Sequence, residues 1–395
     1  MPTVAISHTN EKHRSPERVL ALVEEALKHL GRIESFVKPG QTVLIKPNQA
    51  APHTAMQGSS TDPLVVGALI HLAHCAGAAK VQVAASSDGQ LNAAECMRVN
   101  GMAAMAKHEG AEILNLEGDG VPTREVELPE GRVLHEVRIP VPLIEAGVVI
   151  AVPKARNDYT DVISGAMQLW TGVGSQEWRA LPYSDKELIE RFTDIMTVLR
   201  PDLCVTDALI CGEGDGPEAT MPRWCGCILA STDPVATDVS IARLMGRNWK
   251  LLRFAEAGEE RGLGRREPIT WAGMPLERIA FRAWPGREGF DYLPVNVLVG
   301  SGVTLAGTIG HVKSALDTLL RSGALQHAIS DKGTPTIMLG EAEDPEFERR
   351  LQEGPYVVFD NAARREYKHH PRVFFVPGHP VLESALPQLR KALGL

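Results

Sequence analysis

Four segments of this chain share one pattern, in which an apolar run of strand type passes directly into a polar or glycine-rich turn with ionisable side chains. The four are Val43–Asn48, Val149–Asp158, Leu203–Pro217 and Gly226–Pro234. Short, continuous apolar runs are typical of strands buried in a parallel sheet. Ligands of open α/β sheets bind outside the carboxyl ends of the strands. The pattern therefore predicts one shared small-molecule site, but it does not name the reaction.

Strand-like and helix-like segments alternate along the chain, which predicts an α/β fold of mostly parallel sheets with flanking helices. Ser15-Pro16 and Thr61-Asp62-Pro63 are typical helix starts. The expected helices are Ser15–Gly31, Leu64–Cys75, Asn92–His108 and Ser184–Leu199. The expected strands of this part are Thr3–Ser7, Val43–Pro47, Val81–Ala85, Ala111–Leu116, Gly147–Val152, Leu203–Ala208 and Cys227–Ala230, with a β-ribbon over Arg124–Leu128 and Arg132–Arg138.

The stretch Gly258–Gly289 is dense in Gly, Pro, Arg and Glu, which favours a linker or domain edge. Beyond it, four more strand-like segments alternate with helices, of which Gly310–Arg321 is the clearest; the strands are Val295–Val299, Thr336–Leu339, Tyr356–Phe359 and Val373–Val376. We therefore predict a larger N-terminal α/β domain, residues 1–289, that carries the site. A smaller C-terminal α/β domain follows, residues 290–395.

Charge and hydropathy exclude several classes of protein. The formal net charge of −8 disfavours a general nucleic-acid binder, which needs clustered Lys and Arg. No apolar run reaches the roughly 18 residues that a membrane span requires. The N-terminal segment lacks the basic and apolar regions of a signal peptide. We expect a cytoplasmic protein that binds neither nucleic acid nor membranes, and a homo-oligomer is compatible with the sequence.

The six cysteines allow two interpretations. Four of them could supply thiolates to zinc or to an iron–sulfur cluster: Cys204, Cys211, Cys225 and Cys227. However, the chain has no Cys-x-x-Cys, and Cys204 and Cys227 lie within apolar strand patterns, where cysteine behaves as a small buried hydrophobe. Another candidate for metal binding is the helical set His71, His74 and Cys75, although such a spacing is more often structural.

Several motifs resemble the domain of unknown function 362 family. They are Val43-Leu-Ile-Lys-Pro-Asn48, Thr61-Asp-Pro63, Gly77-Ala-Ala-Lys-Val81 and Leu229-Ala-Ser-Thr-Asp-Pro-Val-Ala-Thr-Asp238, within a resemblance that covers residues 37–246. The resemblance implies an α/β fold whose motifs face a common cleft, and it carries over Lys46, Asn48, Asp233 and Asp238 as site residues. Many members also have a ferredoxin-like cysteine module, and some are linked to redox chemistry.

This chain departs from the family pattern in two places. It has no ferredoxin-type run of cysteines, so the resemblance does not extend to a bound cluster. After Pro153-Lys154 the family has a Lys-x-His turn and a Lys-Asn pair, where this chain has Arg156-Asn-Asp158 and Gln168-Leu169. We expect the segment from Lys154 to Gln168 to determine specificity, with substrate contacts from Arg156, Asn157 and Gln168.

Lys46 and Asn48 flank Pro47 at the end of a buried strand. Pro47 fixes its own φ and biases Lys46 toward extended geometry, so both side chains are held in defined directions. In the functional interpretation, Lys46 binds a substrate carboxylate or phosphate. In the structural alternative, it is a lysine that reaches from the strand end to water.

Carboxylates offer a second set of candidates. The sequence Gly212-Glu-Gly-Asp-Gly-Pro217 predicts a turn in which Glu213 and Asp215 hold Mg²⁺ or another divalent cation, or in which one of them is a general base. An exposed acidic turn is the structural alternative, and Arg223 follows it. Asp233 precedes Pro234, where an aspartate commonly caps a helix, while Asp238 either reaches the cleft or complements the helix dipole.

These observations favour an enzyme that acts on a small anionic, carboxylate-bearing metabolite by proton transfer, with isomerase, racemase or lyase chemistry. The expected catalytic residues are Lys46, Lys154, Asp158, Glu213 and Asp215. The expected substrate-binding residues are Asn48, Arg156, Asn157, Gln168 and Arg223. The expected ligands of a divalent cation are Glu213, Asp215, Asp233 and Asp238.

Two other functional classes remain open. A redox or metal-cluster protein would use the four clustered cysteines. A non-catalytic accessory protein would use the segment with Trp170 and Trp178 as a partner surface. In the C-terminal domain, Gly307-Thr-Ile-Gly-His311 opens a helix whose amides could bind an anion, with His311 as an acid or base.

Overall fold

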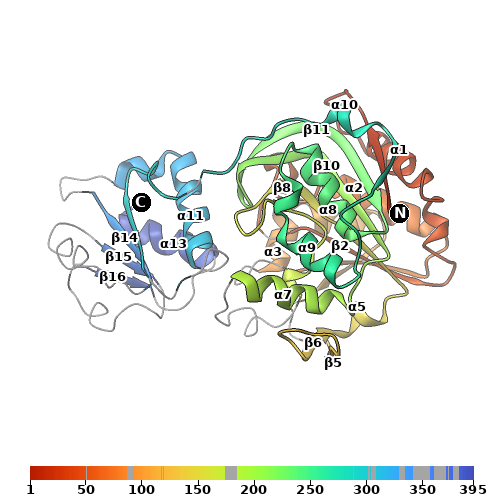
Figure 1. Ribbon diagram of the computed structural model, residues 1–395, viewed down its shortest axis with the longest axis horizontal. Coiled ribbons are helices and arrows are strands. Elements are labelled where there is room, and N and C mark those ends of the chain that lie inside the picture. The colour runs from red at the N-terminus through yellow and green to blue at the C-terminus, as the bar shows by residue number, and fades with distance from the viewer. Residues whose placement is uncertain are drawn as a thin grey trace. The chain divides into compact units, whose positions relative to one another are not determined.

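The computed structural model describes residues 1–49, 51–86, 92–116, 118, 120–173, 185–287, 289–300, 303, 308–328, 334–340, 356–359, 371, 373–376 and 382–395. The chain forms two compact units. The larger unit consists of Met1–Arg179 and Glu187–Pro285, and the smaller unit consists of Ala180–Lys186 and Gly286–Leu395. The α/β class expected from the sequence is confirmed, and Figure 1 shows both units as sheets with helices packed on them.

A ten-stranded sheet, as far as the described residues show, is the centre of the larger unit. Its strands lie in the order β12 (Thr270–Gly273), β1 (Thr3–His8), β11 (Ala219–Ser231), β10 (Leu203–Asp215), β7 (Val148–Val152), β2 (Thr42–Pro47), β3 (Lys80–Ala85) and β4 (Glu112–Asn115). The five strands from β10 to β4 are parallel, whereas β11 is antiparallel to both of its neighbours. The short strand β8 (Lys154–Asn157) follows β7 and pairs with β10 and with β9 (Ile163–Ser164).

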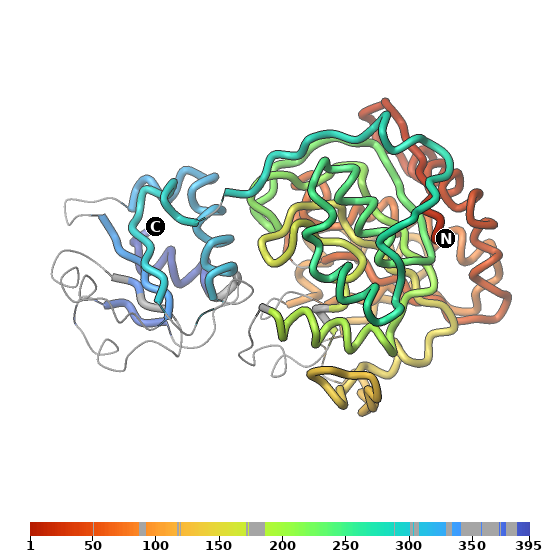
Figure 2. The backbone as a smooth tube through the Cα atoms, viewed as in Figure 1, coloured from red at the N-terminus to blue at the C-terminus, as the bar shows by residue number. Residues whose placement is uncertain are grey.

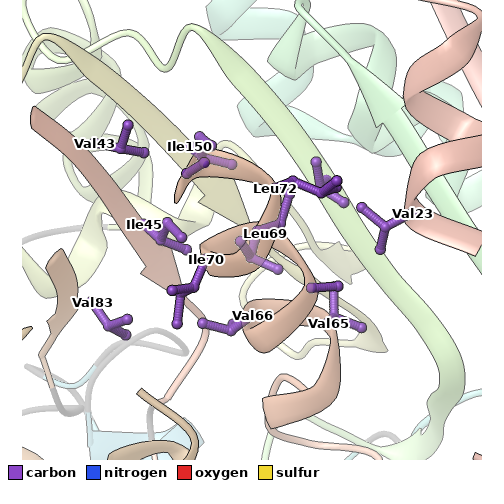
Figure 3. Close-up of a cluster of buried hydrophobic side chains, with 14 of the residues drawn as sticks. Val23, Val43, Ile45, Val65, Val66, Leu69, Ile70, Leu72, Val83 and Ile150 are labelled. Atoms are coloured by element: carbon purple, nitrogen blue, oxygen red, sulfur yellow. The ribbon is translucent and has the colours of Figure 1, made fainter. Parts of the chain in front are cut away.

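Helices cover both faces of this sheet. One face packs on α1 (Pro16–Lys28) and α2 (Pro63–Cys75), whose N-caps are Ser15 and Asp62 as the sequence predicts. Figure 3 shows Ile45 of β2 and Ile150 of β7 beside Leu69 of α2, all within one apolar core. Leu203 and Val205 belong to the same core, whereas Cys204 between them contacts Thr237 of α8 (Pro234–Leu244). Because side chains alternate along a strand, α8 lies on the opposite face.

The remaining elements of the larger unit are short. They are η1 (Ile33–Ser35), η2 (Ala55–Gln57), α3 (Ala93–Asn100), α4 (Met102–His108), α5 (Val141–Glu145), η3 (Gln168–Gly172), α7 (Asp185–Met196), η4 (Trp249–Leu251), α9 (Arg253–Glu260) and α10 (Leu276–Ile279), with the ribbon β5 (Thr123–Glu127) and β6 (Glu136–Pro140). The expected single helix Asn92–His108 is broken at Gly101, which has φ +89°. The expected linker Gly258–Gly289 contains β12, which joins the main sheet beside β1. The predicted cap Ser184 lies outside the described residues.

The expected glycine-rich turn Gly212–Pro217 is wrong for most of its length. Strand β10 continues through Asp215 and pairs with β11 as one long hairpin, in which Asp215 lies opposite Ala219. Gly212 is needed for close packing, because a Cβ there would lie 2.4 Å from the Gly58 carbonyl oxygen and 3.0 Å from Arg156 Cβ. The glycines therefore let three segments approach one another, and only the end of the motif turns the chain.

The smaller unit contains a parallel four-stranded sheet in the order β13 (Asn296–Val299), β14 (Thr336–Leu339), β15 (Tyr356–Phe359) and β16 (Val373–Val376). Its helices are α11 (Gly310–Arg321), η6 (Ala324–Ala328) and α13 (Leu382–Leu393). Val312, Leu316 and Leu319 of α11 pack into a core with Ile337 of β14. Among the described residues of the whole chain, we find no helix with the length and hydrophobicity that a bilayer crossing requires.

One carboxylate fastens the β5–β6 ribbon to the rest of the larger unit. Asp194 of α7 accepts hydrogen bonds from the backbone N–H groups of Arg132 (3.0 Å), Val133 (3.0 Å) and Leu134 (2.9 Å), and it pairs with Arg261. Burial, the largest single influence, raises the pKa of Asp194, but these donors together outweigh it and lower the pKa. The ionised carboxylate is therefore the form that holds the ribbon.

We predict that Gly212→Ala lowers the free energy of unfolding by about 1–3 kcal/mol, the usual cost of overpacking. The added Cβ meets backbone and packed side-chain atoms that have no room to move. Gly147→Ala is the matched control, because its Cβ would meet only the flexible Gln41 side chain at 3.3 Å. Urea unfolding measures both variants. Equal stability of the two would contradict the close approach of β10 and Gly58.

We predict that Asp194→Asn lowers the free energy of unfolding at neutral pH by about 2 kcal/mol, since bonds to a charged acceptor are lost. A lowered pKa gives stability that is present above the ordinary Asp value of 3.8 and is lost as the pH falls through the folded value. The difference in the free energy of unfolding between wild type and variant should therefore become smaller below that pH. Melting temperatures across a pH series test this, with the exposed Glu125→Gln on the same ribbon as control. A gap that is independent of pH would contradict it.

Candidate functional site

The candidate site lies where the direction of strand addition reverses. After β2, the chain adds β3 and β4 on one side of the sheet and then returns to add β7 and β10 on the other side. Figure 2 traces the path of the chain through this unit. The boundary between β2 and β7 is thus the topological switch point, the place at which α/β sheets bind ligands. Lys46 and Pro47 at the end of β2 pair with Ala151 and Val152 of β7, and Lys154 follows two residues later. Two of the predicted residues therefore stand at this edge.

A buried ion pair joins β8 to β10 at this edge. Lys154 Nζ lies 2.7 Å from Asp207 Oδ2, and both side chains are 0% exposed. Asp207 also accepts hydrogen bonds from the backbone N–H groups of Asp62 (2.8 Å) and Leu209 (3.0 Å). The Asp62 N–H belongs to the start of α2, whose positive dipole end further favours a carboxylate there. The pair is thus oriented from β8, β10 and α2 together.

A second ion pair extends from Asp62 toward the surface. Asp62 accepts a hydrogen bond from Leu64 N as the N-cap of α2 and pairs with Arg14, which is partly exposed. Burial raises the pKa of Asp62, the neighbouring Asp207 carboxylate raises it further, and the Arg14 and Lys154 charges oppose this. Two buried carboxylates therefore lie between two cations.

Lys46 and Asn48 are buried at the end of β2, with 2% and 9% exposure. Lys46 Nζ donates to Ser86 Oγ at 3.1 Å, next to the end of β3. Asn48 turns toward the other side, where its Nδ2 donates to the Ser59 carbonyl oxygen at 2.8 Å. The strand end thus presents a cation toward β3 and an amide toward β8.

Arg156 orders the loops around this strand end. Its Nη1 donates to the carbonyl oxygens of Ser59 (2.9 Å) and Pro217 (2.8 Å), and its Nη2 lies 3.5 Å from Asn48 Oδ1. Its neighbour Asn157 similarly donates to the carbonyl oxygens of Gly214 and Trp284. Both residues are expected to bind substrate, and most of their hydrogen bonds to described residues go to backbone carbonyls. These bonds position the loops around the strand end.

The carboxylates that the sequence predicts as ligands of a divalent cation contact other protein groups in the structure. Glu213 accepts from the Trp284 backbone N–H at 3.1 Å and lies 3.6 Å from Arg223, which stacks on Phe281 and is 40% exposed. Asp233 caps α8 by accepting from Ala236 N and also accepts from Arg265 N, as the structural alternative predicts. Among the described residues, no three His, Cys, Asp or Glu side chains form a group that could hold a metal ion.

Asp238 and Asp158 accept hydrogen bonds from backbone N–H groups of the segment from Lys154 to Gln168. Asp238 of α8 accepts from the N–H groups of Ala166 (2.6 Å) and Met167 (3.2 Å), and burial raises its pKa to about 8. Asp158 accepts from Thr160 N at 2.6 Å; burial raises its pKa, and the Arg156 charge opposes this. Gln168, the third residue of this segment that is expected to contact substrate, is the first residue of η3 and is buried. This segment is therefore fixed by carboxylates on α8 and within itself.

The four clustered cysteines are buried thiols, whereas Cys75 is exposed. Cys225 Sγ lies 3.5 Å from Cys227 Sγ, and burial raises the pKa of Cys204 well above its usual range, which disfavours the thiolate that metals require. His71 and Cys75 contact each other at 3.6 Å on α2. Trp170 is 0% exposed, so it does not form a partner surface; Trp178 and Gly307 lie outside the described residues. His311 lies in the first turn of α11.

Three kinds of comparison show which known proteins this chain is similar to. A family model described as "Domain of unknown function (DUF362)" matches residues 43–243. A thylakoid-associated protein of Synechocystis sp. (strain ATCC 27184 / PCC 6803 / Kazusa) is 25% identical over 257 residues, which is 62% of this chain and 75% of that protein. A Thermotoga maritima crystal structure aligns at 13% identity and TM-score 0.39, over 98% of this chain and 84% of that one. The lactate racemase apoprotein of Thermoanaerobacterium thermosaccharolyticum aligns at 9% identity and TM-score 0.38, over 99% and 90%.

We predict that Lys154→Met lowers the free energy of unfolding by about 3–5 kcal/mol, because it leaves Asp207 as an uncompensated buried charge. The double variant Lys154→Met, Asp207→Asn should recover part of this loss, since the remaining partner is then neutral. Lys28→Met, whose side chain is 57% exposed, is the matched control. Denaturant titration compares the three. A Lys154 variant no less stable than the Lys28 variant would contradict the buried pair.

Proposed function

Because this chain belongs to the domain of unknown function 362 family, whose model spans both strands of the switch point, we propose that the larger unit is an enzyme acting on a small anionic metabolite there. The observation that carries the proposal is the Lys154–Asp207 pair, which is wholly buried at the carboxyl edge of the sheet, the edge at which β2 ends with Lys46 and Pro47. A buried ion pair is no more stabilising than a well-packed apolar pair of similar volume. Its position at the edge where α/β sheets bind ligands therefore favours a chemical role.

Lys46 is the proposed ligand of the substrate carboxylate. Its ammonium group stands at the end of β2, away from bulk water, and charge-assisted hydrogen bonds to a carboxylate are stronger than neutral ones. Cations in the same region extend the preference for an anion: Lys154 follows on β8, and Arg14 approaches from the segment before α1. A small carboxylic acid fits this charge pattern.

Lys154 and Asp207 are the proposed proton-transfer pair. In the step that we propose, Asp207 accepts the proton from the carbon next to the substrate carboxylate, and the electron pair left on carbon delocalises into that carboxylate. The Lys154 and Lys46 ammonium groups stabilise the added negative charge. Return of a proton to the same carbon gives racemisation or isotope exchange, and loss of a neighbouring leaving group gives elimination. Arg156 positions the loops and takes no part in the transfer.

We predict that the protein catalyses exchange of the hydrogen next to the carboxylate of its substrate in D₂O. Proton NMR of a panel of 2-hydroxy and 2-amino acids would show loss of that signal with wild-type protein. Asp207→Asn should slow the exchange by about 10²–10⁴-fold, the usual contribution of a general base. Lys46→Met should weaken binding of the acid about tenfold or more, through loss of a charge-assisted bond.

The controls separate chemistry from folding. Lys28→Met removes an exposed lysine and should exchange at the wild-type rate. Circular dichroism and melting temperature show whether the Asp207 and Lys46 variants remain folded. Full binding of the acids by a folded Lys46→Met variant, or unchanged exchange by a folded Asp207→Asn variant, would remove the proposal.

A further inference from the structure

Three buried polar atoms beside this strand end have no hydrogen-bond partner among the described residues: Gln49 Oε1, Ser60 Oγ and Asn100 Oδ1. Their residues are only 2%, 1% and 7% exposed. A buried polar atom left without a partner costs about 1–3 kcal/mol. Native proteins therefore pair such atoms with protein, water or ligand, and three of them in one region require an explanation.

Hydrogen bonds bring the three residues together. Thr61 N donates to the Asn48 carbonyl oxygen at 3.0 Å, which sets Gln49 and Ser60 on adjacent segments. Asn100 Nδ2 lies 3.3 Å from the Thr61 carbonyl oxygen, so this amide contacts the residue that follows Ser60. All three residues therefore surround the contact between Asn48 and Thr61.

The hydrogen bonds of Gln49 and Asn100 also show which atom of each side-chain amide has no partner. Gln49 Nε2 donates to the Cys96 carbonyl oxygen at 3.1 Å, one helical turn before Asn100 in α3. Asn100 Nδ2 donates to the His53 and Thr61 carbonyl oxygens. Both nitrogen atoms are thus used, and the two amide oxygens remain as acceptors without a partner among the described residues.

We propose that these three oxygens bind the ammonium group of an α-amino acid. An ammonium group carries three N–H donors, which matches two amide oxygens and one hydroxyl oxygen. A ligand hydroxyl has a single donor and leaves one of the amide oxygens unpaired. The inference rests on the proposed function, in which Lys46, three residues before Gln49, binds the carboxylate of the same molecule.

The experiment compares acids that differ only at the second carbon. Alanine, lactate and propionate form one set, and glutamate, 2-hydroxyglutarate and glutarate form another. Melting-temperature shifts and calorimetry at millimolar concentrations measure binding to wild type, Ser60→Ala and Thr206→Val. Thr206 is the matched control, because its buried Oγ1 on β10 also lacks a partner among the described residues.

We expect at least one amino acid to bind more tightly than its hydroxy and unsubstituted counterparts. Ser60→Ala should weaken that binding about tenfold, since one hydrogen bond to a charged group is lost, and should leave the unsubstituted acid unaffected. The ligand-free Ser60→Ala protein should be at least as stable as wild type, because an unpaired hydroxyl has been removed. Thr206→Val should leave binding unchanged.

Two results would overturn the inference while leaving the proposed function intact. One is equal binding of amino, hydroxy and unsubstituted acids, all dependent on Lys46. The other is a ligand-free Ser60→Ala protein that is clearly destabilised with acid binding unchanged, which would identify a buried structural water as the partner of the three oxygens. If no acid binds and Lys46→Met changes nothing, the proposed function and the inference both fail.

Discussion

The larger unit depends on the burial of charge at the carboxyl edge of its sheet. Asp207 ties three elements together, because it pairs with Lys154 of β8, accepts the Asp62 N–H at the start of α2 and lies on β10 itself. A carboxylate without these partners would be strongly unfavourable inside a protein. The strands and α2 must therefore meet in one arrangement for the charge to be tolerated, and that arrangement also fixes the site.

Glycine provides the second constraint, since it lets backbone segments approach where side chains would collide. A Cβ on Gly212 would meet Gly58, and one on Gly216 would lie 1.9 Å from the Asn157 carbonyl oxygen. These approaches bring the carbonyl oxygens of Ser59 and Pro217 within reach of the Arg156 guanidinium group. The same close approaches therefore determine both the packing of the β10–β11 hairpin and the positions of the loops around Arg156.

Local patterns predicted the parts of the fold that local chemistry determines. The capped helices α1 and α2, the buried strand β2 and the strands of the smaller unit follow from N-caps, proline positions and apolar runs. The glycine motif at Gly212 was misread as a turn, because close approach between distant segments leaves no local sign. Asp207 and Asp62 were missed as site residues for the same reason, although Asp207 is a carboxylate inside an apolar strand, which is a usable signal.

A comparison of Asp194 with the region around Asn48 shows why burial of charge alone does not indicate function. Each oxygen of Asp194 has donors, three of them backbone N–H groups, and the result is a fastening of the β5–β6 ribbon. Around Asn48, by contrast, buried charges stand next to polar atoms that the described residues leave unpaired. We propose a bound molecule as the partner of the Ser60 hydroxyl, because a buried hydroxyl without any partner lowers the stability of the fold.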